Sequence, residues 1–314
     1  MLRVRIISPP ASTNDVVSFL DAQSEAVDII VVRGAGHRPD GDLITCDLSA
    51  ASADLLVDEL QRLGVTADGA VSLSDAPAVL DEDPYDDEVH DPRGDDAVVW
   101  PRVLAELGRH ARFSGTFAVL SIVATVIASI GVLTDSPVLI VGAMVVGPDF
   151  PVVAAICLGI VLGHYKLALR ALATLLGGFV IGIVWVYAGT LVGQAIGIVD
   201  EQLHVAERTA TVFTSDFGML GLLVAVFAGA AGMVSVTSER PGVLIGVLIS
   251  VTTVPAAATI GVAAVAGDAA VAWGATVTLV ANLAGILLGG IATLLVQRAI
   301  TRRAVRRDQV ARAV

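Results

Sequence analysis

The chain has 314 residues, of which 55% are hydrophobic and only 16% charged, and its mean hydropathy is +0.81. A soluble domain carries about 25% charged residues, so we expect most of this chain to be surrounded by lipid or buried in protein. The net charge of −12 is unevenly placed, with −15 in residues 1–96 and +3 in residues 97–314. Because phosphate binding needs clustered Lys and Arg, this balance argues against nucleic acid as a partner.

Residues 1–74 predict a small α/β head. Four apolar stretches have the pattern of strands, and two amphipathic stretches between them have the pattern of helices, with a turn at residues 34–41. The resulting order βαββαβ is that of a ferredoxin-like sandwich. Because this fold hosts many unrelated functions, the sequence favours a folded cap or oligomerisation domain and leaves a regulatory small-molecule site open.

Residues 75–96 form an acidic low-complexity stretch with ten Asp or Glu side chains and with Pro77, Pro84 and Pro92. Like charges repel and proline opposes helix, so this stretch predicts a flexible tether. Calcium binding is the alternative, but the stretch lacks the glycine and the ligand spacing of an EF-hand loop.

Residues 97–113 predict an interfacial helix, because apolar side chains recur at helical spacing with Arg102, Arg109 and Arg112 between them. Residues 114–297 then predict a membrane domain whose apolar stretches are long enough to cross a bilayer. Six spans are expected, at residues 114–133, 137–163, 171–198, 216–236, 242–266 and 269–296. Residues 298–314 are expected to be a basic tail.

The distribution of Lys and Arg predicts the orientation of these spans. Six spans place every basic stretch on one side of the membrane, whereas five or seven would not. These stretches are the segment before the first span, the loop with Lys166 and Arg170, the turn at Arg240 and the tail. We therefore expect a multi-pass protein of the plasma (inner, cytoplasmic) membrane with both termini in the cytoplasm.

The second span is interrupted by the run Gly147-Pro148-Asp149-Phe150-Pro151. Proline removes a backbone donor and clashes with the preceding turn, so the helix should break here. A broken helix must be buried in protein or line a cavity. The charge of Asp149 costs several kcal/mol in the membrane unless it is paired or hydrated, which favours a functional role. The alternative is that Asp149 only caps the second half-helix.

The fifth span contains a second polar interruption, and the two halves of the domain resemble each other. Val138-Leu139-Ile140 and Val243-Leu244-Ile245 precede the two interruptions, and spans three and six share Leu-Leu-Gly-Gly at 175–178 and 287–290. Paired broken helices in inverted three-span repeats indicate the central site of a transporter. The candidate pathway residues are Gly147, Pro148, Asp149, Pro151, Ser250, Thr252, Thr253, Pro255 and Asn282.

Other chemistry finds little support in the sequence. Cys46 and Cys157 suggest small buried apolar residues, and the histidines show no metal-ligand spacing. No hydrolase, kinase or metal motif is present, so we expect no catalytic residue, no metal and no cofactor. The many glycines of the spans predict close helix packing and contacts in a homo-oligomer.

Residues 141–148, Val-Gly-Ala-Met-Val-Val-Gly-Pro, together with Pro151, resemble the Gly-Ala-Met…Pro…Pro signature of the domain-of-unknown-function 389 family, membrane proteins of bacteria and archaea. Residues 241–261 and 281–286 are similar to later blocks of that family, and the resemblance covers about 110–297. The chain departs from the family at Asp149-Phe150, where two small residues are common, and at Val254, where a second proline is common. The resemblance implies a membrane architecture and no particular activity.

Two functions follow from these expectations. The leading one is a transporter or channel-like protein for a small solute or ion, with its site at the broken helices in the bilayer. The alternative is a membrane-anchored sensor or scaffold whose cytoplasmic head binds a ligand or partner. A chain that lacks the head and keeps its full phenotype would count against the alternative.

Overall fold

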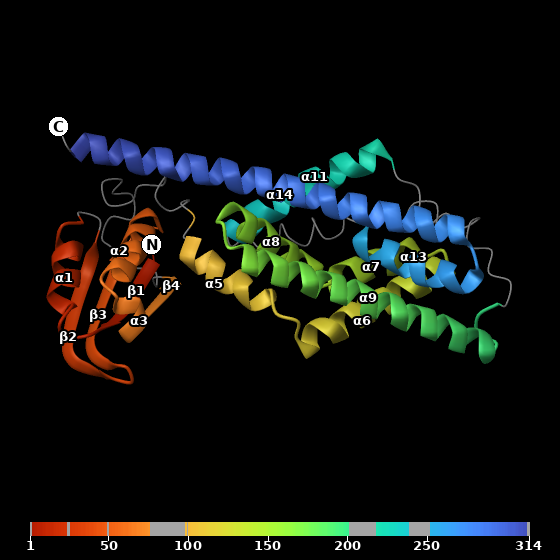
Figure 1. Cartoon of the computed structure of the whole chain (residues 1–314), viewed down its shortest axis with the longest axis horizontal. Coiled ribbons are helices and arrows are strands. Elements are labelled where there is room, and N and C mark those ends of the chain that lie inside the picture. Colours follow the sequence, from red (N-terminus) through yellow and green to blue (C-terminus); the bar gives the residue numbers. More distant parts are fainter. Residues whose placement is uncertain are drawn as a thin grey trace, which may run out of the picture. The chain divides into compact units, whose positions relative to one another are not determined.

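The computed structural model of the chain (Figure 1) describes residues 2–23, 26–48, 50–75, 98, 100–200, 218–238 and 252–312. The chain divides into two compact units. One unit, Met1–Val103 with Ala299–Val314, contains a four-stranded antiparallel sheet, and the other, Leu104–Arg298, is built from apolar helices.

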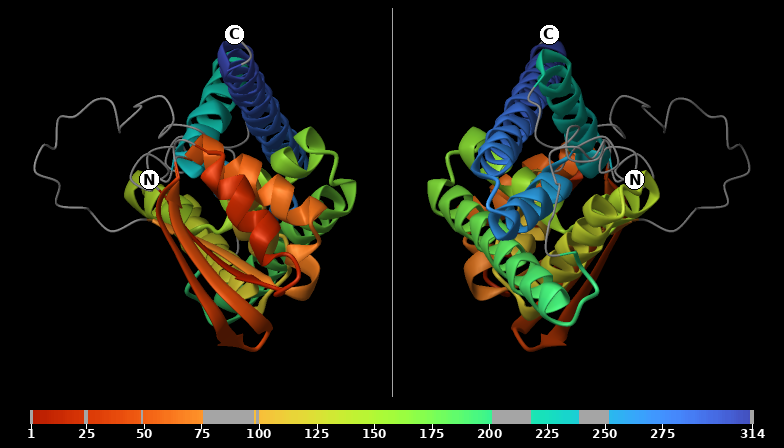
Figure 2. Two further views of the ribbon diagram at one scale, coloured as in Figure 1. Left: turned by 90° about the vertical axis from the view of Figure 1, so that its left-hand side faces the viewer. Right: turned by 90° about the vertical axis from the view of Figure 1, so that its right-hand side faces the viewer.

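The head is one antiparallel sheet with two helices on one of its faces (Figure 2). Its elements are β1 (Leu2–Ser8), α1 (Thr13–Asp21), β2 (Val27–His37), β3 (Asp40–Leu48), α2 (Ala50–Arg62), α3 (Val65–Asp68) and β4 (Ala70–Asp75), and the strand order is β2-β3-β1-β4. Because side chains alternate across a strand, Val4 and Ile6 of β1 share the face that also packs Leu20 of α1 and Leu60 of α2.

The strand β2 is longer than the sequence predicts. It continues to His37 through residues expected in a turn, and the reversal itself is at Arg38-Pro39. The carboxylate of Asp42 stabilises this hairpin, because it accepts a hydrogen bond from the Gly34 amide at 2.7 Å and one from the Thr13 hydroxyl at 2.8 Å. These donors, the Gly34 amide first, lower the pKa of Asp42 below its ordinary value.

The two cysteines are buried and free, as the sequence predicts. Cys46 lies in the apolar core beside the sheet, and burial raises the pKa of its thiol to about 11. The thiol is therefore protonated at neutral pH and unreactive. In the helical unit, Cys157 lies against Leu287 and Gly290 of α14.

Within its described residues, the helical unit contains four helices that are long and apolar enough to cross a membrane, and a bent pair that counts as a fifth. Its elements are α5 (Trp100–His110), α6 (Gly115–Leu133), α7 (Pro137–Val146), α8 (Asp149–Val161), α9 (Tyr165–Ala195), α11 (Met219–Thr237), α13 (Thr253–Ala266) and α14 (Ala269–Arg312). The spans are α6, α9, α11 and α14, and the bent pair is α7–α8. The apolar helix α13 is shorter, and the start of the expected fifth span lies outside the described residues. Four or five of the six expected spans are thus accounted for, as in a multi-pass membrane protein.

Two helices extend beyond their predicted ends. The helix α9 begins at Tyr165, so Lys166 and Arg170 lie on a helix and not in the predicted loop. The helix α14 continues through the segment predicted as a basic tail, up to Arg312.

Within α6, the hydroxyls of Thr125 and Ser129 donate to carbonyls of the preceding turn, which satisfies these polar groups inside an apolar helix.

The helices α11 and α14 approach closely at glycines. A Cβ on Gly229 would collide with the carbonyl of Ile286, and a Cβ on Gly289 would collide with the carbonyl of Val226. The close helix packing expected from the glycine content is therefore present here.

We expect Gly229→Leu to lower the free energy of unfolding by about 1–3 kcal/mol, because the new side chain must push α14 away. Gly221→Leu on the same helix is the control, since no atom lies within 4 Å of a Cβ there. Thermal unfolding of the purified chain in detergent measures both variants. Equal stability of the two variants would contradict the packing described here.

Candidate functional site

The helix break predicted in the second span is present. The axes of α7 and α8 differ by 50° across Gly147 and Pro148 (Figure 1). Gly147 ends α7 by donating to the Ala143 carbonyl, and Pro148 has no amide hydrogen with which to continue the helix. Pro151 lies in the first turn of α8, where proline is tolerated because the amides there have no partner within the helix.

The N-termini of two half-helices meet at this break. Asp149 is the first residue of α8, and Thr253 is the first residue of α13. The Thr253 hydroxyl donates to Oδ2 of Asp149 at 2.7 Å, and Thr253 is only 3% exposed. The structure thus brings together the interruptions that the sequence marks in spans two and five, about a hundred residues apart.

Asn282 joins the same cluster from α14. Its side-chain amide donates to the hydroxyl of Thr252, the N-cap residue of α13, at 2.8 Å. Asn282 is 6% exposed, so this hydrogen bond is largely shielded from solvent. Of the other predicted pathway residues, Pro255 is buried in the first turn of α13, and Ser250 lies outside the described residues.

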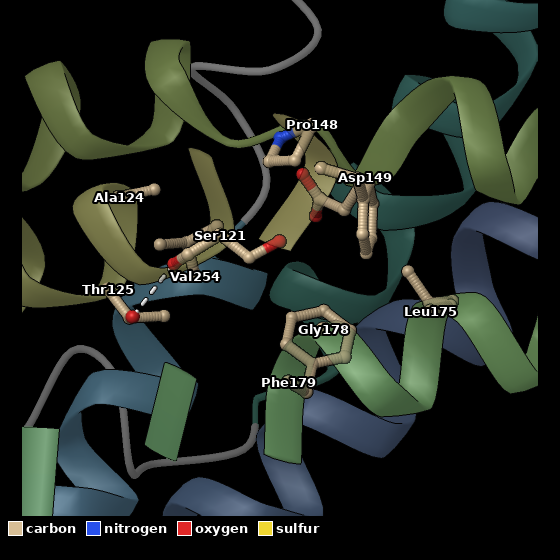
Figure 3. Close-up of a pocket in the computed structure, with 10 residues that line it drawn as sticks. Ser121, Ala124, Thr125, Pro148, Asp149, Leu175, Gly178, Phe179 and Val254 are labelled. Carbon is tan, nitrogen blue, oxygen red and sulfur yellow. Dashed lines mark hydrogen bonds between the residues drawn. The ribbon is translucent and has the colours of Figure 1, made fainter. Parts of the chain in front are cut away.

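A small cavity of about 20 Å³ opens beside Asp149. Figure 3 shows the Asp149 carboxylate and the Ser121 hydroxyl pointing into the same space. The other walls come from Phe117, Ala124, Thr125, Pro148, Leu175, Gly178, Phe179 and Val254. About 10–15 Å³ of such space holds one water, so the cavity fits one water or one small ion.

Ser121 and Thr125 of α6 were missed by the sequence analysis. They lie four residues apart in an otherwise apolar span, and this spacing places them on one face of the helix. Serine and threonine also occur in ordinary packed spans, so this spacing alone does not indicate a site. The position of α6 opposite the break identifies Ser121 and Thr125 as part of it. Thr125 donates to the Ser121 carbonyl at 2.8 Å, which leaves the Ser121 hydroxyl as the polar group of α6 that points toward Asp149.

The environment of Asp149 is polar on one side only. Among the described residues no ion pair involves Asp149, and no cluster of three His, Cys, Asp or Glu side chains could hold a metal. The N-terminus of α8 carries partial positive charge, which favours a carboxylate there. The N-cap position of α8 is Pro148, so Asp149 is the first residue of the helix, and its carboxylate accepts a hydrogen bond from its own backbone amide as well as from Thr253.

Gly147 is required by space at this junction. A Cβ on Gly147 would lie 2.9 Å from Val254 and 3.0 Å from Oδ1 of Asp149. Both distances are shorter than an ordinary van der Waals contact, so a larger residue would push α13 away from α8. Close approach of the two half-helices therefore depends on a small residue at the break.

We expect Thr253→Val to lower the free energy of unfolding by about 1–3 kcal/mol, because the carboxylate of Asp149 loses its hydroxyl donor while the side-chain volume is kept. Thr253→Ser is the matched control, since serine keeps the donor. Thermal unfolding in detergent compares the two variants. If both are destabilised equally, the hydrogen bond to Asp149 does not contribute to stability.

Comparison with known proteins finds similarity over the segment that contains this site. A segment of 148 residues is 26% identical to an uncharacterized protein of Methanocaldococcus jannaschii, covering 47% of this chain and 43% of that protein. The match thus spans less than half the length of that relative, and no solved structure matches the chain. Residues 144–288, which hold Asp149, Thr253 and Asn282, match the domain of unknown function 389 (DUF389). The resemblance seen in the sequence is confirmed over residues 144–288, which match the model of the DUF389 family.

Proposed function

We propose that this protein transports a small solute or ion across the membrane, at a site where the N-termini of α8 and α13 meet. The observation that carries the proposal is the hydrogen bond between Thr253 and Asp149, the first residues of two half-helices. Broken helices that expose their N-termini near the middle of the bilayer are how many transporters build their binding sites. A carboxylate, two helix ends and a cavity for one small particle are the chemistry available here.

The helix starts support an internal repeat. The helices α6, α8 and α9 begin at Gly115, Asp149 and Tyr165, and α11, α13 and α14 begin at Met219, Thr253 and Ala269. In each of the three pairs the second helix begins 104 residues after the first. Gly163 and Gly267, which follow α8 and α13, share this spacing, and both have a positive φ. Three helix starts and one pair of turn glycines with the same spacing favour two copies of one structural unit.

Contacts between the halves support a two-fold relation. Cys157 of α8 lies against Gly290 and the Leu287 carbonyl of α14. The equivalent residues, 104 positions later or earlier in the sequence, make the same contact with the roles of the two halves exchanged. Gly261 of α13 lies against Val186 and the Ile183 carbonyl of α9. Each half thus packs its short helix on the long helix of the other half. With three spans in each half, the two copies would be inverted relative to each other, as the sequence predicts, and Asp149 and Thr253 would lie near the axis that relates them.

The spacing also corrects the alignment made from the sequence. The two Leu-Leu-Gly-Gly runs are 112 residues apart, so they are out of register with the helix starts. In the register of 104 residues, Gly178 is equivalent to Asn282 and Thr174 to Thr278. The repeat therefore rests on helix ends and contacts, and not on those runs.

We also infer that the head has the ferredoxin-like arrangement and that the chain lies in the plasma membrane with both termini in the cytoplasm. The strand order β2-β3-β1-β4, with antiparallel neighbours throughout, supports the first inference. The gathering of Lys and Arg on one side of a six-span topology supports the second.

If the cavity belongs to a transport pathway, water must reach it. In a chain with Cys46 and Cys157 replaced by alanine, we expect Ser121→Cys to react with a charged, membrane-impermeant thiol reagent, because residue 121 faces the cavity. Ser129→Cys is the control, since Ser129 is equally buried on the same helix but outside the cavity. The extent of labelling of the two variants in vesicles is measured as the increase in protein mass. If Ser121→Cys reacts no faster than Ser129→Cys, the cavity is dry and closed.

Asp149→Asn should abolish transport, or its dependence on pH, while the protein still assembles. Neutral asparagine keeps the shape but cannot carry the charge that would bind a cation or proton. The measurement is electrical current or solute uptake in proteoliposomes, for the small ions and solutes that the wild-type chain carries. Asp135→Asn, in the turn between α6 and α7, controls for loss of an acid outside the cavity. Flux in Asp149→Asn equal to wild-type flux would exclude this role.

A further inference from the structure

A second, larger hollow lies away from the broken helices. It has a volume of about 720 Å³ and lies where α5 leads into α6 beside the start of α9, and its walls are Arg112, Phe113, Arg170, Ala173 and Thr174. None of these residues belongs to the proposed transport site, and the hollow is open to the surroundings. We call it the arginine groove.

Packing fixes the two sides of the arginine groove relative to each other. The buried hydroxyl of Thr174 donates to the Ala111 carbonyl at 2.9 Å, which ties the end of α5 to α9. Phe113 lies over Gly177, where a Cβ would be 3.3 Å from its ring, and meets Phe117 edge-to-face with 5.7 Å between ring centroids. Arg112 and Arg170 are therefore held on opposite sides of one hollow, and not merely near each other in sequence.

The groove carries positive charge with no counter-charge among the residues that the structure describes. Arg112 and Arg170 are both exposed, and neither forms an ion pair with any residue that the structure describes. A guanidinium binds phosphate oxygens through paired N–H donors, so two of them facing one space suit a phosphate group.

The groove lies at the ends of apolar helices. Arg112 precedes Ser114, the N-cap of α6, and Arg170 precedes the apolar part of α9. Exposed apolar side chains continue along α9 from this point, at Leu169, Leu172 and Leu176. Charged groups next to an exposed apolar stripe match a molecule with a phosphate at one end and a hydrocarbon chain at the other.

We propose that the arginine groove binds the phosphate headgroup of an anionic phospholipid, whose acyl chain lies along the exposed leucines of α9. Basic pockets between helices at the membrane surface recognise lipids in this way. The small Ala173 leaves room for the headgroup between the two guanidiniums. Phe113 lines the same groove and contacts the first carbons of the chain.

The test uses the full chain in a neutral detergent. Phosphatidylglycerol should raise the midpoint of thermal unfolding by at least about 3 °C, because a ligand that binds only the folded state stabilises it. Phosphatidylcholine with the same acyl chains should have less than half this effect. In Arg112→Gln/Arg170→Gln the shift with phosphatidylglycerol should disappear, and in Arg112→Lys/Arg170→Lys part of it should return.

The matched control is Arg109→Gln/Lys166→Gln, which removes two exposed positive charges that lie three and four residues from Arg112 and Arg170 in the sequence but outside the groove. This variant should keep the full shift. Loss of the shift in this control would mean general attraction to negative lipid and would overturn the proposal. An equal shift with soluble glycerol phosphate would assign the groove to a free anion. No shift in the wild-type chain would exclude the site.

Discussion

A break inside an apolar helix leaves backbone groups that lipid cannot satisfy, and this constraint explains the arrangement of the helical unit. The ends of α7 and α8 at Gly147 and Pro148 must lie within protein, so other helices have to surround them. The helix α13 fills this position, because it packs against both α6 and α9 and brings its own N-terminus to the break. Small residues at the contacts follow from the same requirement, since only a residue such as Gly147 lets the two half-helices approach.

The charge of Asp149 is only partly compensated by the protein. One hydrogen bond to a charged group contributes about 1.5–3 kcal/mol, and a helix N-terminus contributes up to about 2 kcal/mol. Desolvation of a carboxylate in a protein interior costs several kcal/mol, and an ionised carboxylate has about four positions that can accept a hydrogen bond. Thr253 donates to one of them, and the backbone amide of Asp149 also donates to the carboxylate. A water or small ion in the adjoining cavity would supply a further partner.

The features that could be predicted from the sequence are those encoded locally. The break at 147–151 follows from its prolines, and the strands of the head follow from alternating apolar residues. The partner of Asp149 could not be derived in this way, because the contact with Thr253 depends on the packing of helices about a hundred residues apart. Of the two pairs of runs on which the sequence bases the repeat, the Val-Leu-Ile runs begin 105 residues apart, close to the spacing of the helix starts, whereas the Leu-Leu-Gly-Gly runs begin 112 residues apart.

The proposed repeat is symmetric in its backbone but not in its side chains, and this difference affects the space beside Asp149. In the second half, Asn282 donates to Thr252, and these two side chains fill the space between α13 and α14. The equivalent residues of the first half are Gly178 and Pro148, which have no polar side chain, and both line the cavity beside Asp149. In the proposed repeat, two-fold packing would set the position of the site. The absence of polar side chains at Gly178 and Pro148 leaves space beside Asp149, whose carboxylate gives the cavity a polar side.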